Sequence, residues 1–433
     1  MRTERLRAGV ISLGCSKNRV DSEKILACLR DAGFEITNDE TRADAVVVNT
    51  CGFIEPAKQE SINAILEAAR SRKPGGVLAV AGCLSQRYLK ELSEELPEAD
   101  ILHGVGDHEG LVEKIRQKLG QTGAVRYCGS RVLTTPAYSA YLRIADGCDN
   151  RCTYCAIPLI RGGRRSVLAD ELVNEARSLA QRGVKEITLI AQDTSAYGLE
   201  LYGRPSLAEL LGKIAAIDEL HWVRVLYAYP NTVDERLVDA MLGSEKIVKY
   251  IDMPIQHIDP QILSRMNRHG SAEHIRRIVD YIRRASPEFI LRTTVMTGFP
   301  GETEEQFDRL AEFLREHPFD RLGAFAFSPE DGTAAADFPG RIDEDTAKRR
   351  LDAIMRAQRE ISRRRNERRV GREYEALIED ITNGVALCRS YAEAPEVDGK
   401  IAVSGVPEGT SPGDFIRTRI VAAGAYDLKG VYL

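Results

Sequence analysis

Long hydrophobic segments are missing from this sequence of 433 residues. No apolar run approaches the roughly 18 residues that a transmembrane helix needs, so we expect no membrane partner. The positively charged start, MRTERLRAGVISLGCS, carries too short an apolar stretch for a secretory signal, whose hydrophobic region spans about 7–15 residues. We therefore expect a cytoplasmic protein in a reducing compartment, where cysteines remain available to metals or to chemistry instead of forming disulfides.

Strong charge of one sign, internal repeats and low-complexity tracts are also missing. The net charge of −5 at pH 7 is mild for this length and gives no overall attraction to nucleic acid. No solenoid period or biased tract is present, which excludes repeat and disordered architectures. The chain is longer than one hydrophobic core usually organises, so two or three globular domains are expected.

Alternating strand and helix patterns predict the first two domains. From about residue 7 to 120, short apolar runs such as DAVVVN and GVLAVAG alternate with helical stretches, which predicts a parallel sheet. Residues 121–137 lack such a pattern and form a predicted linker. A second series contains six strands, short of the eight that close a barrel, and therefore predicts a partial barrel. These strands are expected near 139–144, 186–190, 222–227, 249–252, 289–296 and 321–327.

The last sixty-odd residues differ in character. They follow a long arginine-rich helix at about 343–369, and they alternate apolar and polar residues between turns such as Asn383-Gly384, which predicts a small antiparallel β-barrel. The fold class is thus α/β, with a parallel-sheet domain, a central partial (βα)6 barrel and a terminal β-barrel. The predicted domains are 1–125, 134–366 and 367–433. Arg363-Arg364-Arg365 suggests a nucleic-acid patch, but interspersed glutamates favour a solvated linker helix.

Three cysteines are crowded into the segment ADGCDNRCTYCAIP, immediately after the first strand of the second domain. Cys148, Cys152 and Cys155 form a C-x3-C-x2-C pattern. Zinc prefers four ligands, and the histidines nearest in sequence are His108 and His221, so a zinc site is the weaker alternative. Iron-sulfur clusters also usually take four protein ligands, and three cysteines predict a cubane cluster with one iron open to a substrate or cofactor.

A second triplet lies at the carboxyl ends of three strands of the first domain. Cys15, Cys51 and Cys83 each follow a predicted strand. Ligands of open parallel sheets bind in the crevice outside the carboxyl ends of the strands, so these cysteines are expected to converge on a second cluster. The remaining cysteines are assigned to structure: Cys28 to a helix core, and Cys128 and Cys388 to unspecified structural positions.

The cysteine motif with its preceding aromatic residue, on a partial β-α barrel, resembles the radical S-adenosylmethionine superfamily. The resemblance implies that the cofactor chelates the open iron and that its carbon-sulfur bond is split to give a deoxyadenosyl radical. It also implies that Tyr154 lies beside the adenine and that Gly298 and Gly301, in TGFPGE, lie close to the cofactor. The two glycines could equally serve only the tight turn into the following helix.

The segments SLGCSKNRVDSEKI, NTCGFIEPAKQES and AGCLSQRY, together with the radical motif and the terminal barrel, are similar to the radical S-adenosylmethionine methylthiotransferase family over essentially the whole chain. The similarity implies two 4Fe-4S clusters, S-adenosyl-L-methionine as both methyl donor and radical source, an external electron donor, and a terminal TRAM domain. Insertion of a methylthio group at an unactivated C–H bond is the implied activity.

Two branches of that family differ in substrate. One modifies adenosine in tRNA, and the other modifies the β-carbon of an aspartate in the twelfth small-subunit ribosomal protein. GCSKNRVDSEK and CDNRCTYCAIPLIRG are similar to the protein-modifying branch, whereas tRNA enzymes tend to carry GCQMN. Residues 371–433 contain six basic against ten acidic side chains, which disfavours tRNA binding and suits a basic ribosomal protein. A metal-dependent RNA-binding module without catalysis is the competing class.

Further candidates flank these motifs. Gln192, Asp193 and Thr194 follow a barrel strand and could bind the cofactor or cap the next helix. Arg161 and Arg164 could bind the carboxylate of the cofactor or of the substrate. Two more candidates come from strands: Arg292, which would need a partner if buried, and His257, which either lines the site or is a satisfied core histidine.

Overall fold

Five parallel strands form a sheet at the N-terminal end of the chain, in the order β2-β1-β3-β4-β5. The computed structural model describes residues 5–121, 125, 129 and 131–433. The strands are β1 (Arg7–Ser12), β2 (Glu35–Ile36), β3 (Ala45–Thr50), β4 (Val77–Gly82) and β5 (Ile101–Leu102). Every residue of β3 and β4 is buried, as expected for a parallel sheet covered by helices on both faces. This confirms the predicted N-terminal parallel-sheet domain.

Two layers of helices cover this sheet. One layer consists of α1 (Ser16–Asp31) and α5 (His108–Lys118), and the other of α2 (Glu55–Ser71), α3 (Cys83–Arg87) and α4 (Leu89–Glu95). A 3₁₀ turn, η1 (Glu40–Arg42), precedes β3. Cys28 is 1% exposed within the first layer, which confirms it as a core residue. Cys128 lies outside the described residues.

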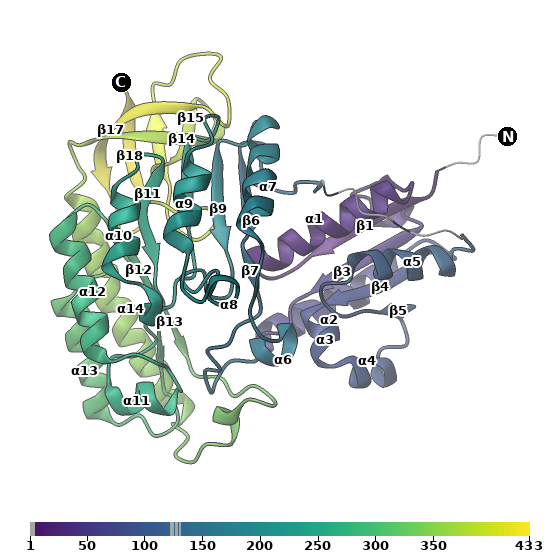
Figure 1. Ribbon diagram of the computed structural model, residues 1–433, viewed down its shortest axis with the longest axis horizontal. Coiled ribbons are helices and arrows are strands. Elements are labelled where there is room, and N and C mark those ends of the chain that lie inside the picture. The colour runs from purple at the N-terminus through teal and green to yellow at the C-terminus, as the bar shows by residue number, and fades with distance from the viewer. Residues whose placement is uncertain (1–4, 122–124, 126–128, 130) are drawn as a thin grey trace.

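A second, six-stranded parallel sheet follows, in the order β13-β12-β11-β10-β9-β6 (Figure 1). All six predicted strands are present, and the sheet is open, which confirms a partial barrel. The strands are β6 (Ser139–Arg143), β9 (Glu186–Ile190), β10 (Trp222–Val225), β11 (Ile247–Asp252), β12 (Ile290–Thr297) and β13 (Arg321–Ala326). A two-stranded hairpin, β7 (Ala145–Asp146) and β8 (Arg165–Ser166), frames the loop that carries the C-x3-C-x2-C motif.

Helices pack on one face of this second sheet. Two short helices lie elsewhere, since α6 (Ile157–Arg161) contacts α3 and α8 (Leu199–Tyr202) contacts β8, and the 3₁₀ turns η2 (Pro230–Thr232) and η3 (Ala334–Asp337) lie in connections. The helices on the sheet face are α7 (Ala169–Gln181), α9 (Leu207–Ala215), α10 (Glu235–Leu242), α11 (Pro260–Arg265), α12 (Ala272–Ala285) and α13 (Glu304–Glu316). Alternate strand residues such as Leu189, Val225 and Ile251 face these helices and build the largest core. None of the helices in the described ranges is long and apolar enough to cross a membrane.

The arginine-rich helix α14 (Glu344–Glu367) connects the second sheet to the C-terminal barrel. Arg363 and Arg364 form ion pairs with Glu360 on the same helix, and Arg365 pairs with Asp320 at 2.6 Å. These arginines are engaged with carboxylates of the chain itself, which supports the linker-helix interpretation over a nucleic-acid patch.

The C-terminal domain is a closed five-stranded barrel in the order β14-β15-β16-β18-β17. Its strands are β14 (Glu373–Thr382), β15 (Val385–Arg389), β16 (Ile401–Ser404), β17 (Phe415–Ala423) and β18 (Leu428–Tyr432). The predicted antiparallel barrel is confirmed except at one seam, where β16 and β18 pair in parallel and close it. Cys388 is fully buried in the barrel core, as its structural assignment predicted.

The C-terminal barrel is attached to the second sheet by buried charge. The segment after β15 packs Ala392 and Ala394 against the sheet face opposite the helices. Beneath it, Glu186 accepts hydrogen bonds from Arg389 at 2.5 Å and from Arg224 at 2.9 Å, and all three side chains are fully buried. The barrel is therefore fixed to the amino-terminal end of β9, at the opposite end of the strands from the C-x3-C-x2-C loop.

Acid is expected to weaken this attachment. Burial favours the neutral carboxyl, but Arg389 and Arg224 outweigh it and lower the pKa of Glu186 to about 2, and Arg369 does the same for Glu393. Carboxylates with lowered pKa stabilise the fold fully above their unfolded value of about 4.5 and lose that contribution as the pH falls towards 2. Denaturant unfolding of the C-terminal barrel across this range should show a steep loss of stability; a flat profile would contradict the assignment.

Candidate active site

The cysteines of the N-terminal triplet stand at the carboxyl edge of the first sheet. Cys15 precedes the first residue of α1, Cys51 follows the last residue of β3, and Cys83 begins α3 directly after β4. Hydrogen bonds fix these loops. The side-chain amide of Asn18, in the first turn of α1, donates to the carbonyls of Leu13 at 2.7 Å and Thr50 at 3.2 Å. It therefore joins the loop of Cys15 to that of Cys51.

A glycine adjoins each of these cysteines and lets the loops approach one another. A Cβ on Gly14 would lie 3.0 Å from the sulfur of Cys51, and one on Gly52 would lie 2.7 Å from the Cα of Leu84. Gly82 has a φ of +97°, and a Cβ there would lie 2.7 Å from the carbonyl oxygen of Thr50. The pattern of a glycine beside each cysteine was readable in the sequence, although only the cysteines were identified from it.

Replacing Gly82 by alanine is expected to disrupt the N-terminal triplet. The left-handed α conformation costs an alanine about 1–2 kcal/mol. Gly82, with a φ of +97° and a ψ of −156°, lies in a region that essentially only glycine adopts, and a backbone collision is added there. Gly75→Ala is the matched control, because Gly75 has a φ of +76° with open space around its Cα. We expect a lower melting temperature for both variants, with a larger drop and a loss of reconstituted iron only for Gly82→Ala. Equal iron contents would contradict this role of Gly82.

The second triplet lies on the loop between β7 and α6. The amide of Cys148 donates to the carbonyl of Gly162 at 3.1 Å, and that of Cys155 donates to Cys152 at 3.0 Å, which coils the loop tightly. Gly147, with a φ of +74°, passes so close to this return that a Cβ would lie 2.2 Å from the carbonyl oxygen of Gly163. Three thiols are thus presented from one compact loop at the carboxyl edge of the second sheet.

All six cysteines line one cavity of about 370 Å³ between the first two domains. Its volume is within the range of cofactor and ligand sites. The thiols are spread over its wall, and in the part of the chain that the structure describes no three His, Cys, Asp or Glu side chains converge on a point where one metal ion would sit. Three thiols from each domain around a shared cavity fit the donor chemistry of two iron-sulfur clusters.

The thiols differ in their electrostatic surroundings. Burial raises the pKa of Cys83 and of Cys148 to about 11, and that of Cys155 to about 12. Burial also acts to raise the pKa of Cys15, but the charge of Lys17 and the backbone amide of Asn18 outweigh it and lower the pKa below the ordinary value. Cys15 is thus the thiol best disposed to ionise without a bound metal.

Arg161 lies between the two triplets and joins the two domains. The residue is 3% exposed, and its guanidinium donates to Asp21 of α1 at 2.8 Å and to Asp146 of β7 at 3.2 Å. It also lies 3.5 Å from the sulfur of Cys83. Arg161 lines the cavity as predicted for a site residue, but both of its carboxylate partners belong to the chain.

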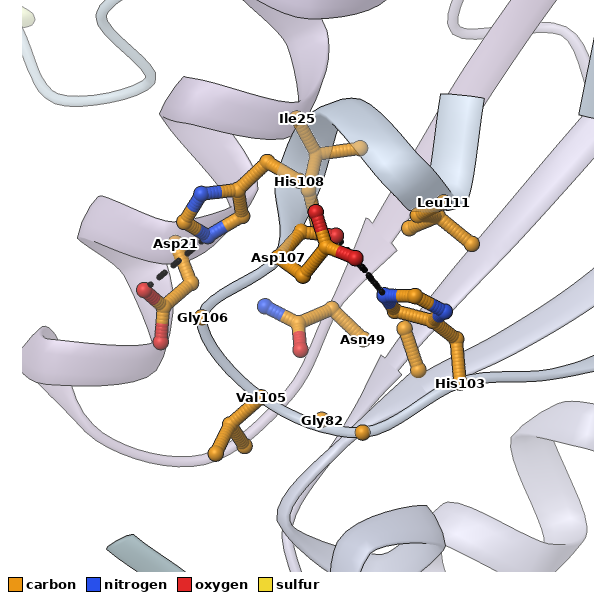
Figure 2. Close-up of a pocket in the computed structure, with 12 residues that line it drawn as sticks. Asp21, Ile25, Asn49, Gly82, His103, Val105, Gly106, Asp107, His108 and Leu111 are labelled. Atoms are coloured by element: carbon orange, nitrogen blue, oxygen red, sulfur yellow. Dashed lines mark hydrogen bonds and ion pairs between the residues drawn. The ribbon is translucent and has the colours of Figure 1, made fainter. Parts of the chain in front are cut away.

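A smaller cavity lies behind Asp21, where Figure 2 shows His108 pointing towards Asp21, and Asp107 towards His103. Nε2 of His108 is 3.3 Å from Oδ1 of Asp21, and Nε2 of His103 is 2.7 Å from the carbonyl of Asp107. The volume of about 10 Å³ is no more than one water molecule needs. Its side chains therefore position Asp21, and through it Arg161, and leave no space for a substrate.

Besides Arg161, two of the predicted cofactor residues line the large cavity. The hydroxyl of Tyr154 accepts a hydrogen bond from Arg268 at 3.1 Å. Gln192 donates to Asp146 at 3.1 Å, and its side-chain oxygen is buried without a hydrogen-bond partner among the described residues. Asp193 lies behind the wall, where it accepts from the backbone of Ala196 at 3.2 Å and from Asn150 at 2.9 Å. These contacts fit the capping alternative for Asp193. Thr194 donates to the carbonyl of Leu226.

The remaining predicted residues do not line this cavity. Gly298 and Gly301 have positive φ and pack against Ala347 and Arg265, which fits the turn geometry that is one of the two alternatives. His257 is a satisfied core histidine: it is fully buried, accepts from the amide of Asp259 at 2.9 Å and lies 3.2 Å from Glu302.

The two other arginines are engaged in ion pairs away from the cavity. Arg292 pairs with Asp252 at 2.8 Å. Arg164 pairs with Glu200 at 2.9 Å.

Several lining residues escaped the sequence analysis. Arg268 lies 4.0 Å from the sulfur of Cys152, donates to the carbonyl of Pro254, and stacks on Tyr229 with 4.3 Å between its guanidinium carbon and the ring centroid. Tyr227 and Lys17 close the cavity between the domains. The tyrosines follow β10, so the rule that barrel sites form at strand ends would have found them. No local pattern marks Arg268 or Lys17.

Family models match three parts of the chain. The model described as uncharacterized protein family UPF0004 matches residues 7–104, that of the radical SAM superfamily matches 142–314, and that of the TRAM domain matches 370–433. Among solved structures, the radical S-adenosylmethionine methyltransferase TsrM from Kitasatospora setae has a TM-score of 0.59 at 17% identity and covers 77% of each chain. At that identity the likeness concerns the fold alone.

Two relatives are similar to this chain over nearly its whole length. The ribosomal protein uS12 methylthiotransferase RimO of Caldicellulosiruptor saccharolyticus is 45% identical over 438 residues, with 98% of this chain and 99% of the relative covered. The RimO of Geobacter sulfurreducens is 43% identical over 439 residues, with 98% of each covered. With the three matched domains and the two cysteine triplets, this similarity shows that the chain belongs to the RimO family of radical S-adenosylmethionine methylthiotransferases.

Proposed function

We propose that this enzyme adds a methylthio group to the β-carbon of an aspartate in the small-subunit ribosomal protein uS12, with two 4Fe-4S clusters and S-adenosyl-L-methionine as cofactors. The single observation that carries the proposal is that six cysteines from two domains face one cavity. The names of the similar proteins support uS12 as the substrate. Because uS12 is a ribosomal component, the proposed compartment is the cytoplasm, and an external donor supplies the electrons.

The proposed division of labour follows the domains. Cys148, Cys152 and Cys155 hold the cluster that binds the cofactor, and Cys15, Cys51 and Cys83 hold the auxiliary cluster. When bound, the cofactor and its cluster supply a radical able to take hydrogen from an unactivated carbon. The functional units correspond to residues 1–125, 134–366 and 367–433.

The chain's own side chains bind and orient the reacting groups. Tyr154 and Gln192, on the wall near the second triplet, contact the cofactor, and Arg268 provides a positive charge beside Cys152. Arg161 places a positive charge against Cys83 and, through Asp21 and Asp146, holds the two domains at a fixed distance. A cofactor bound between the domains would be partly shielded from water, which protects a reactive radical from side reactions.

The C-terminal barrel supports a protein substrate over tRNA. Single-stranded nucleic acid binding uses basic grooves with aromatic stacking, whereas this barrel carries more acidic than basic side chains. Several of its basic residues are also engaged with its own carboxylates, such as Arg417 and Arg419 with Glu373. This composition suits a basic protein surface.

The proposal is tested by offering both substrates to the same preparation. Enzyme reconstituted anaerobically and reduced is incubated with S-adenosyl-L-methionine and either purified uS12 or unmodified tRNA. We expect the mass of uS12 to rise by one methylthio group on a single aspartate, as read by peptide fragmentation, and the tRNA nucleosides to stay unchanged. Methylthio-adenosine in the tRNA with unmodified uS12 would overturn the proposal. Assembled small subunits, tested in parallel, report which form of uS12 is used.

A further inference from the structure

Lys17 lies on the wall of the large cavity, where the first domain meets the second. It is the second residue of α1 and follows Cys15 by two positions. Its ammonium lies 3.4 Å from the ring centroid of Tyr227, a residue of the second domain that follows β10. The neighbouring Ser16 hydroxyl is 3.5 Å from the Tyr227 hydroxyl. The lysine side chain is thus held by the ring at the boundary between the two cysteine triplets.

The ammonium of Lys17 is left without an acceptor. A lysine has three N–H donors, and contact with a ring face satisfies none of them as a conventional hydrogen bond. Nζ of Lys17 makes no hydrogen bond or ion pair with any residue in the described ranges. By contrast, Arg161 is neutralised by Asp21 and Asp146. A half-buried cation with free donors, facing a cavity, is arranged to receive an anionic group from outside the chain.

A second cation of the cavity takes a different place. Arg268 also has no carboxylate partner among the described residues, and it lies beside Cys152 and Tyr154. The proposed reaction brings two carboxylates into the cavity, one on the methionine part of the cofactor and one on the substrate aspartate. Arg268 is next to the cofactor-binding triplet, whereas Lys17 is next to Cys15 of the auxiliary triplet. The two cations therefore match two different carboxylates.

We propose that Lys17 binds the side-chain carboxylate of the substrate aspartate and so determines the specificity of the enzyme for aspartate; this rests on the proposed function. The carboxylate carbon is bonded directly to the β-carbon. Fixing the carboxylate against Lys17 therefore places the reacting carbon within one bond of an anchored group, between the auxiliary triplet and the cofactor. Orientation of this kind is a large source of rate enhancement.

The test compares binding of two forms of the substrate to one protein. Full-length uS12 and its variant with asparagine at the modified aspartate have nearly the same shape but differ in charge. Each is titrated against the anaerobically reconstituted full chain, and the dissociation constants are measured. Four enzymes are compared: wild type, Lys17→Met, Lys17→Arg and, as matched control, Lys90→Met, which changes an exposed lysine of α4 outside the cavity. Iron content confirms that all four carry the same clusters.

We expect the wild type and Lys90→Met to bind the aspartate form about tenfold or more tightly than the asparagine form, because a charge-assisted hydrogen bond changes affinity by about that factor. Lys17→Met should lose the preference, and Lys17→Arg should keep most of it. The ratio of the two dissociation constants is insensitive to a general loss of affinity, since both forms bind to the same enzyme variant.

Two results would overturn the inference while leaving the proposed function intact. In the first, Lys17→Met binds both forms as tightly as the wild type does and keeps the preference for the aspartate form. In the second, Lys17→Met binds both forms more weakly by the same factor, which would limit Lys17 to a structural contact with Tyr227. If the wild type bound neither form and left the aspartate of uS12 unmodified, the proposed function itself would fail and the assignment of Lys17 with it.

Discussion

Changing Cys15, Cys51 and Cys83 to alanine is expected to lower the iron content of the anaerobically reconstituted protein from about eight to about four atoms per chain, since each cubane cluster contains four. The three thiols come from loops after β1, β3 and β4 and face the cavity opposite the C-x3-C-x2-C loop. Besides Cys148, Cys152 and Cys155, which the proposal assigns to the other cluster, no further cysteine among the described residues lines that cavity, because Cys28 and Cys388 are buried in separate cores. Nothing nearby can therefore replace the lost ligands.

The reciprocal variant and a matched control make this result specific. Changing Cys148, Cys152 and Cys155 to alanine should also leave about four irons, but with complete loss of reductive cofactor cleavage. Cys28→Ala, which removes a thiol from the same domain but from the core of α1, should keep about eight. Iron and sulfide analysis, together with the absorbance near 400 nm, gives the cluster content of all three variants. Four irons in the wild type and in the Cys15, Cys51 and Cys83 variant alike would mean that this triplet binds no cluster.

Convergence of the two triplets was predictable because it follows from topology. Strands that are parallel in a sheet end at the same edge, so Cys15, Cys51 and Cys83 could be grouped from their positions after apolar runs. The six strands of the second sheet were likewise readable, because each is a short segment of four to eight residues that contains apolar residues and follows a helical stretch or the linker. The two-residue strand β2 was missed, since two residues carry no periodicity.

Contacts between domains could not be predicted from local patterns. Arg161 was identified as an anion-binding candidate, but its partner Asp21 lies on a helix of another domain, and nothing in the spacing of the two residues links them. Lys17 and Arg268 face the cavity only because the first domain docks on the second. Gly298 and Gly301 show another case, where a family motif suggests the cofactor and the positive φ of both residues also fits a tight turn, so proximity to the cofactor stays a prediction. Side-chain pairing across an interface therefore needs the three-dimensional arrangement.

The second large expected effect is a loss of stability when the attachment of the C-terminal barrel is weakened. Glu186→Gln removes the carboxylate that is shared by Arg224 and Arg389, and all three side chains are fully buried. Two guanidinium groups are then left without their shared counter-charge in the interior, apart from the pairing of Arg389 with Glu379. Breaking a buried ion pair from one side costs about 3–5 kcal/mol. We expect the free energy of unfolding to fall by that amount, whereas Glu219→Gln, an exposed change in the same domain, should alter it by less than about 0.5 kcal/mol.

Two further measurements separate a charge effect from general disruption. The combined variant Glu186→Met, Arg224→Leu and Arg389→Met removes all three charges, and it should be more stable than Glu186→Gln alone, because replacing a whole buried ionic group by apolar side chains is often neutral or stabilising. Iron content should stay unchanged in both variants, since Glu186 begins β9 and the cysteine loops lie at the other end of the strands. Denaturant unfolding and limited proteolysis between α14 and the barrel report the docking. If Glu186→Gln were as stable as the wild type, apolar contacts such as those of Ala392 and Ala394 would be enough to hold the barrel on the second sheet.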